Sequence, residues 1–168
     1  AREGILIKDA GTLEKLHKVN VVVMDKTGTI TKGRPELVSI TNQSDKTDRE
    51  LIAILASLEK KSEHPIAHAI VVYAEKNKIM PLAVAKFKAI KGKGVNGLVG
   101  ETEYFAGSPK LIESLKIPFD AGQLEKESLE GKTPIILATS QAVLGIIMVA
   151  DDIKPEAVEA ISKLHKLG

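Results

Sequence analysis

A short apolar run, VVVM at residues 21–24, leads directly into Asp25 and the small polar sequence KTGTITKG. Four consecutive apolar residues rich in β-branched side chains predict a strand that is buried on both faces, as in a parallel sheet. Asp25 would then lie at the C-terminal end of this strand, at the sheet edge where open α/β folds bind ligands. The run therefore predicts an α/β fold and makes Asp25 a candidate reactive carboxylate. The alternative from the pattern alone is an ordinary strand end followed by a Thr/Gly turn.

Composition excludes several classes of function. The chain has 168 residues, of which 43% are hydrophobic and 27% charged, and this is typical of a globular protein with one domain or two small ones. A net charge of +2 gives no broad basic field for nucleic acid, so we expect no nucleic-acid partner. The absence of cysteine excludes disulfides, thiolate metal sites and cysteine nucleophiles within this sequence.

Hydrophobic periodicity changes along the chain from strand-like over residues 1–33 to alternating helical and strand-like segments. The predicted elements are a helix at 48–61 capped by Thr47 or Asp48, a helix starting at Pro65, strands with a tight hairpin at 85–109, helical sequence at 109–130, two strands within 135–150 and a helix over 151–168. In the last helix, Val158, Ile161 and Leu164 are expected to point inward. This order predicts a small α+β domain inserted into an incomplete α/β domain.

Two familiar nucleotide motifs fail on their context. Residues 92–97, GKGVNG, have the G-x-G-x-x-G spacing, but a strand-like sequence follows them where a dinucleotide fingerprint needs a helix. Residues 130–133, EGKT, resemble the end of a P-loop, but its first glycine would fall on Lys126. The sequence therefore argues against NAD binding and against a P-loop.

The segment after the apolar run carries the first family resemblance. Residues 25–31, DKTGTIT, are identical to the phosphorylation signature of P-type ATPases. Related phosphatases of the haloacid dehalogenase class carry a second aspartate, a general acid/base, at the position of Thr27. A carboxylate nucleophile without this base should form an acyl phosphate and keep it, as a pump requires. The resemblance implies Asp25, Lys26 and Thr27 as catalytic residues, with Asp25 and Thr27 supplying part of a Mg²⁺ site.

A second motif narrows the resemblance. SEHPIA at residues 62–67 resembles the SEHP signature in the nucleotide-binding domain of heavy-metal-transporting, CPx-type P-type ATPases, and Glu59 stands five residues before His64 as it does there. The resemblance implies that Glu59 recognises the adenine amino group and that His64 orients the base. It also implies that Gly92 and Gly94 let the backbone approach the nucleotide, where a Cβ would collide.

Further matches extend the resemblance over essentially the whole chain. Residues 131–133, GKT, match the end of the family's nucleotide domain and place Lys132 at the nucleotide, while Asp151 matches the family's hinge aspartate. One departure is Ser108, which stands where the family commonly has an asparagine that helps to place the nucleotide. Serine still donates and accepts hydrogen bonds but is shorter, so Ser108 is expected to alter affinity or base selectivity.

The resemblance implies an α/β fold with an incomplete haloacid-dehalogenase-like phosphorylation domain and an inserted α+β nucleotide-binding domain, whose antiparallel sheet is flanked by helices. The implied boundaries are 1–33 and 145–168 for the phosphorylation domain and 34–144 for the nucleotide domain. The implied function is the cytoplasmic, ATP-binding and phosphoryl-accepting part of a membrane pump for heavy-metal ions, with copper expected first and zinc, cadmium or cobalt as alternatives. ATP and Mg²⁺ are the implied cofactors; the transported ion and the actuator and transmembrane domains of the same chain are the implied partners.

Later motifs of the family, which complete its Mg²⁺ site, would lie beyond Gly168, so the sequence as given is expected to bind ATP without turnover. A soluble phosphatase and a non-catalytic nucleotide-binding module remain the alternatives. The lysines at 86, 88, 91 and 93 are expected to form a solvated strand face, with added positive potential near phosphates as the other interpretation.

Overall fold

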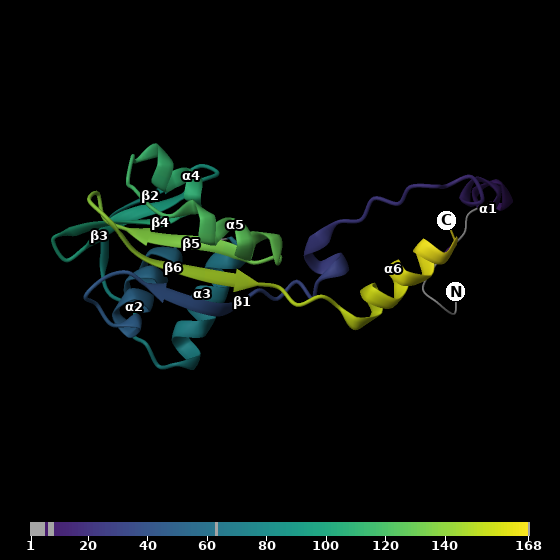
Figure 1. The fold of residues 1–168 in the computed structure, drawn as a ribbon. Coiled ribbons are helices and arrows are strands. Elements are labelled where there is room, and N and C mark those ends of the chain that lie inside the picture. The colour runs from purple at the N-terminus through teal and green to yellow at the C-terminus, as the bar shows by residue number, and fades with distance from the viewer. Residues whose placement is uncertain (1–5, 7–8, 63, 168) are drawn as a thin grey trace.

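An antiparallel sheet of six strands organises the computed structural model, which describes residues 6, 9–62 and 64–167 (Figure 1). The strands are β1 (Glu36–Asn42), β2 (Val84–Ile90), β3 (Gly94–Val99), β4 (Thr102–Gly107), β5 (Thr133–Ala138) and β6 (Val143–Ala150). Their order in the sheet is β1-β6-β5-β4-β3-β2, and all neighbours are antiparallel. The two strands predicted within 135–150 and the strands predicted at 85–109 are thereby confirmed.

Helices cover both faces of this sheet. They are α2 (Asp48–Glu59) and α3 (Pro65–Lys76) on one face and α4 (Pro109–Ser114) and α5 (Ala121–Leu129) on the other (Figure 1). The central strands alternate between the two cores: Ile135 and Leu137 of β5 pack with α2 and α3, whereas Ile136 packs with α4 and α5. Because side chains alternate across a strand, a sheet covered on both faces requires continuous apolar strands, which explains the apolar sequence of β5 and β6.

Local sequence fixes where α2 and α3 begin. Thr47 caps α2 in a reciprocal capping box with Glu50, as the predicted N-terminus requires. Pro65 occupies the first turn of α3, where its missing N–H costs no hydrogen bond. Both predicted helices are confirmed, and Ile70 of α3 is fully buried against α2.

The predicted buried strand before Asp25 is absent. Residues 19–24 are extended but pair with no strand, and their side chains are exposed, up to 93% for Val23. A strand buried on both faces needs neighbouring strands and covering helices, and all six strands of the described chain belong to a sheet that these residues do not join. Asp25 therefore precedes a turn, η1 (Lys26–Ile30), in which Thr27 and Gly28 are not helical, instead of ending a strand.

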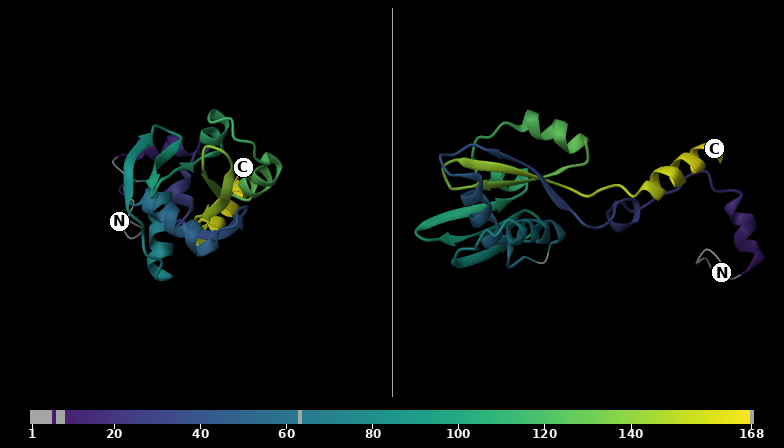
Figure 2. Two further views of the ribbon diagram at one scale, coloured as in Figure 1. Left: turned by 90° about the vertical axis from the view of Figure 1, so that its left-hand side faces the viewer. Right: turned by 90° about the horizontal axis from the view of Figure 1, so that it is seen from below.

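The two terminal helices lie away from the sheet (Figures 1 and 2). One is α1 (Ala10–Leu16), capped by Asp9, in a region predicted to be strand-like. The other is α6 (Pro155–Leu167), whose helical character was predicted. Its expected inward face is wrong, since Val158 is 59% exposed and no residue of α6 is buried: the apolar stripe meets no core of the described chain. No helix among the described residues combines the length and apolarity needed to cross a bilayer.

Two segments connect the sheet to these helices and lie against each other. Thr31 forms an isolated antiparallel bridge with Ile153, and the backbone N–H groups of Lys32 and Lys154 donate to Asp152 O and Ile30 O. Strand β6 continues to Ala150 before this crossing, so the sheet extends past residue 144, the expected boundary.

A pair of glycines sets the spacing of β3 and β4. Gly94 lies opposite Gly107 in the ladder and has φ +152°. A Cβ at Gly94 would lie 2.2 Å from Ala106 O, and one at Gly107 would lie 2.2 Å from Lys93 O. Both positions therefore exclude a side chain because of the neighbouring backbone.

We expect Gly94→Ala to lower the free energy of unfolding by about 3 kcal/mol or more, because backbone strain adds to a clash that no flexible side chain can relieve. Gly100→Ala is the matched control: its φ is also positive, at +62°, but no described atom beyond its chain neighbours lies within 4 Å of a Cβ there, so strain alone should cost about 1 kcal/mol. Chemical denaturation measures both, and equal losses would contradict the close approach of β3 and β4.

Candidate functional site

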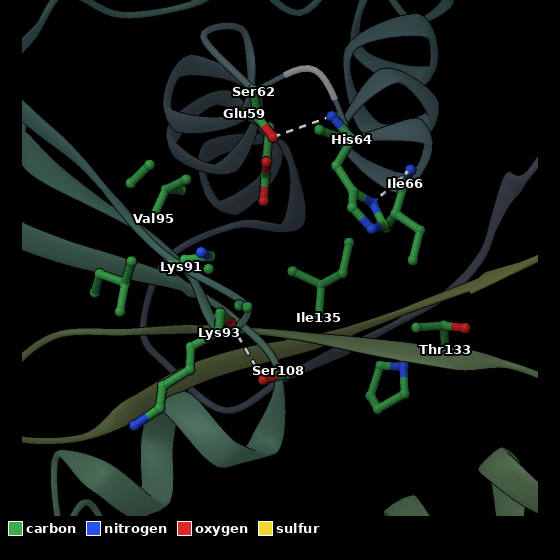
Figure 3. Close-up of a pocket in the computed structure, with 17 residues that line it drawn as sticks. Glu59, Ser62, His64, Ile66, Lys91, Lys93, Val95, Ser108, Thr133 and Ile135 are labelled. Carbon is green, nitrogen blue, oxygen red and sulfur yellow. Dashed lines mark hydrogen bonds between the residues drawn. The ribbon is translucent and has the colours of Figure 1, made fainter.

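A cleft of about 420 Å³ lies where several elements end on the α2/α3 side of the sheet (Figure 3). This volume suits a small-molecule ligand. Its walls come from the end of α2, the start of α3, the β2–β3 turn, the β4–α4 junction and the start of β5. The lining residues are Glu59, Ser62, His64, Ile66, Ala67, Ala89, Ile90, Lys91, Gly92, Lys93, Gly94, Val95, Gly107, Ser108, Thr133, Pro134 and Ile135.

Glu59, the last residue of α2, places a buried carboxyl in this cleft. It is 8% exposed. Burial raises its pKa to about 7, although a hydrogen bond with the Ser62 side chain acts in the opposite direction. Such a carboxyl is stabilised as an anion by any ligand that donates hydrogen bonds to it. The structure thus brings this predicted residue into the cleft, with an environment that the sequence motif does not reveal.

His64 forms two hydrogen bonds at the start of α3. It is the N-cap residue, and its Nδ1 accepts a hydrogen bond from the Ile66 N–H at 3.2 Å. Its own backbone N–H donates to Ser62 Oγ at 3.4 Å. Because Nδ1 accepts, the proton of the neutral ring lies on Nε2, which leaves a hydrogen-bond donor for a ligand in the cleft.

The predicted glycines have different reasons to be glycine. Gly92 has φ +69° in the turn between β2 and β3, and among the described residues other than its chain neighbours no atom lies within 4 Å of a Cβ built there. The space beside Gly92 is therefore open to a ligand. Gly94 also lines the cleft, but the reason inferred from the sequence is incomplete, because its Cβ would already collide with β4 without any nucleotide.

Ser108 fastens the glycine turn instead of leaving its side chain free. Its backbone N–H and its Oγ both donate to Lys93 O, at 2.8 and 3.2 Å. The turn that carries Gly92 is thereby tied to the start of α4. Ser108 lines the cleft as predicted, but its hydroxyl already has a partner within the protein.

Lys132, which the sequence predicts to lie beside the nucleotide, is not among the residues that line the cleft. Its ammonium group pairs with Glu130 at 3.0 Å, two residues earlier in the same turn. Its neighbour Thr133 lines the cleft in its place.

Sequence reasoning missed the apolar wall of the cleft. Ile66, Val95 and Ile135 line it, but the sequence presents each only as part of an apolar stripe or strand, which is also the signal of a core residue. Gly107 was missed as well. Its signal is present at the end of a predicted strand, where a glycine indicates a close backbone approach.

A second, smaller cleft of about 210 Å³ adjoins the first, since both include His64, Ile66 and Thr133 in their walls. Lys26 and Thr27 of the phosphorylation signature line this second cleft, together with Asp151. Asp25 lines neither cleft, and its side chain is exposed. The structure therefore brings the loop of Asp25 next to the His64 end of the larger cleft.

Asp151 ties together the two segments that join the sheet to η1 and α6. Its carboxylate accepts hydrogen bonds from the Thr31 hydroxyl and from the N–H groups of Gly33, at 3.0 Å, and Arg34, at 3.1 Å. Burial by itself raises the pKa of Asp151, but these three hydrogen bonds and the charge of Lys26 together hold it below its usual value. Asp151 therefore stays ionised at the crossing.

Among the described residues, no three or more His, Asp or Glu side chains gather closely enough to hold a metal ion on their own. The carboxylate of Asp25 and the hydroxyl of Thr27 are hard oxygen ligands, which is the kind that Mg²⁺ prefers. Mg²⁺ commonly binds to one or two carboxylates and completes its shell with water and substrate phosphates. The loop of Asp25 and Thr27 therefore offers the type of ligand atom that part of a Mg²⁺ site requires.

We expect the raised pKa of Glu59 to make stability depend on pH. Because the folded chain holds this proton more tightly than the unfolded chain, the contribution of Glu59 to stability is greatest below pH 4.5 and falls as pH rises to about 7. Relative to Glu59→Gln, the free energy of unfolding should decline across this window by on the order of 3 kcal/mol. Denaturation of both proteins at several pH values measures the difference, and a difference that stays constant or rises with pH would contradict the buried carboxyl.

Comparison with known proteins identifies the family of the chain. Residues 19–168 match the family of haloacid dehalogenase-like hydrolases. The copper-exporting P-type ATPase B of Archaeoglobus fulgidus is 44% identical over 168 residues, covering all of this chain and 24% of that protein. The chain thus spans about a quarter of the length of the curated relatives it matches.

Solved structures show the same relationship. A zinc-transporting PIB-type ATPase in the E2.Pi state has a TM-score of 0.70 and 32% identity, covering 99% of this chain and 27% of that one. The catalytic domain of the CPx-ATPase CopB-B, solved in a study of nucleotide binding, has a TM-score of 0.66 and 25% identity, covering 98% of this chain and 58% of that one. The chain belongs to the haloacid dehalogenase-like hydrolases, and within them it resembles the catalytic domain of heavy-metal P-type ATPases.

Proposed function

We propose that this chain binds ATP and accepts its phosphoryl group as part of a heavy-metal-transporting P-type ATPase. The observation that carries the proposal is the adjacency of the two clefts. Glu59 and His64 line the larger one, Lys26 and Thr27 line the smaller one, and His64 belongs to both. A ligand held by His64 would extend from the buried carboxyl toward the phosphorylation signature.

In this proposal the larger cleft holds the base. The Glu59 carboxylate accepts a hydrogen bond from the exocyclic amino group of adenine, and the Nε2–H of His64 orients the ring. Ile66 and Ile135 offer apolar contact to its faces. Gly92 allows close backbone approach, and Ser108 acts through the turn that it fastens. Lys132 lies just before β5, and its proposed contribution to nucleotide binding comes from beside the cleft and not from its wall.

Asp25 is the proposed phosphoryl acceptor, and Lys26 and Thr27 are proposed to orient the incoming phosphate. Mg²⁺ would be held by Asp25 and Thr27 together with nucleotide phosphates and would neutralise phosphoryl charge. Asp151 is the proposed hinge, because it joins the segment between η1 and β1 to the segment between β6 and α6. We place the nucleotide domain at about 34–150, since β6 runs to Ala150.

The wider setting is inferred from the relatives. Their names include copper-exporting and zinc-transporting pumps, and copper is our first proposal for the transported ion. The chain would act on the cytoplasmic side of a membrane with actuator and transmembrane domains of the same protein. A soluble phosphatase is not favoured, since Thr27 replaces the general acid/base of that class and the matched relatives are pumps.

We expect calorimetric titration to show saturable binding of ATP and ADP, with no preference for NAD. His64→Asn keeps a side chain that can cap α3 but removes the imidazole, so ATP affinity should fall about tenfold, or ~1.4 kcal/mol, without loss of fold. His64→Gln should lose affinity and also destabilise α3. His68→Gln, on an exposed position of α3, is the control and should bind as the parent chain does. Unchanged ATP affinity in both His64 variants would refute the assignment of the cleft.

We also expect no stable phosphoenzyme when the 168-residue chain is mixed with ATP and Mg²⁺, because Asp25 and Thr27 supply only part of the site that neutralises phosphoryl charge. Acid quenching followed by detection of acyl phosphate measures this. An acyl phosphate that is lost in Asp25→Asn would show that the chain catalyses transfer alone.

A further inference from the structure

We infer that Lys91 and Lys93 bind the polyphosphate of the nucleotide and make the cleft discriminate ATP and ADP from adenosine. The inference rests on the proposed nucleotide binding and concerns which end of the cleft receives the phosphates. It assigns a specificity role to two side chains that the family motifs leave out.

The structure separates four lysines that the sequence presents as one group. Lys86 and Lys88 lie on the edge strand β2 and do not line the cleft, whereas Lys91 and Lys93 do. All four are exposed. The expected solvated strand face therefore describes the first pair, and the second pair stands at the rim of a ligand-sized space.

The turn that carries Lys91 and Lys93 is fixed on both sides. The Lys93 N–H donates to Ile90 O at 2.9 Å, and Lys93 O accepts both hydrogen bonds from Ser108. Between the two lysines lies Gly92, and apart from these two chain neighbours no described atom lies within 4 Å of a Cβ built there. Two cations thus flank a backbone position that a ligand can approach closely, and their backbone is held in place before the ligand arrives.

The two ends of the cleft carry different types of charged group. Glu59 lies at one end, Lys93 and Ser108 lie at the other, and Lys91 lies on the opposite side of the space from His64 (Figure 3). Within the described part of the chain, neither lysine takes part in an ion pair. A ligand with hydrogen-bond donors at one end and several negative charges at the other complements this arrangement, as a nucleoside di- or triphosphate does.

The test compares two double variants that remove the same charge. We expect Lys91→Gln/Lys93→Gln to bind ATP about tenfold more weakly, since exposed ion pairs contribute modestly and two are lost. Adenosine affinity should stay unchanged. Lys86→Gln/Lys88→Gln removes the same charge from the neighbouring strand β2, and it should change ATP affinity less than about twofold because exposed charges at a distance are screened. Calorimetry at two salt concentrations should also show a weaker salt dependence in the first variant than in the parent chain.

The outcomes separate this inference from the proposed function. If the parent chain binds both ATP and adenosine but Lys91→Gln/Lys93→Gln keeps its ATP affinity, the phosphate assignment is overturned and nucleotide binding stands. Equal losses of ATP affinity in both double variants would also overturn it, because they would indicate a diffuse field. A folded parent chain that binds neither ligand would overturn the proposed function and this inference together.

Discussion

The burial of β5 and β6 on both faces is the constraint on which the rest of the structure depends. Their side chains alternate between the α2/α3 core and the α4/α5 core, so these strands must be apolar throughout and must lie in the middle of the sheet. Polar functional groups therefore lie at the ends of the strands and helices. The cleft forms at such ends, where α2 stops, α3 starts and the β2–β3 turn folds over β4.

This position gives the cleft two environments. At the α2 end, packing buries a carboxyl and raises the pKa of Glu59, while α3 fixes the tautomer of His64 by using its Nδ1 as a cap. At the opposite end, the turn around Gly92 is exposed and carries cations. The wall shared with the second cleft then brings the phosphorylation signature near, and Asp151 holds the crossing between them. The buried carboxyl and the cationic turn therefore border the larger cleft, and the second cleft with the phosphorylation signature adjoins it at His64.

Sequence predicted those parts that depend on local signals. Thr47 and Pro65 mark helix starts, and the motifs around Asp25 and His64 identified the family. Features that depend on tertiary partners were wrong or missed. Residues 19–24 have strand character but no strand beside them among the described residues, α6 has an apolar stripe with no core to cover it, and the close approach of β3 and β4 at Gly94 is visible only once the register is known.

The most direct measurement is an NMR experiment on the isotope-labelled chain with saturating ATP, which records intermolecular nuclear Overhauser effects from the adenine protons. We predict contacts from adenine to the side chains of His64, Ile66 and Ile135, which would place the base between α3 and β5. Contacts to residues of α4 and α5 on the opposite face of the sheet, or saturable binding without any contact to the cleft, would contradict nucleotide recognition at Glu59 and His64.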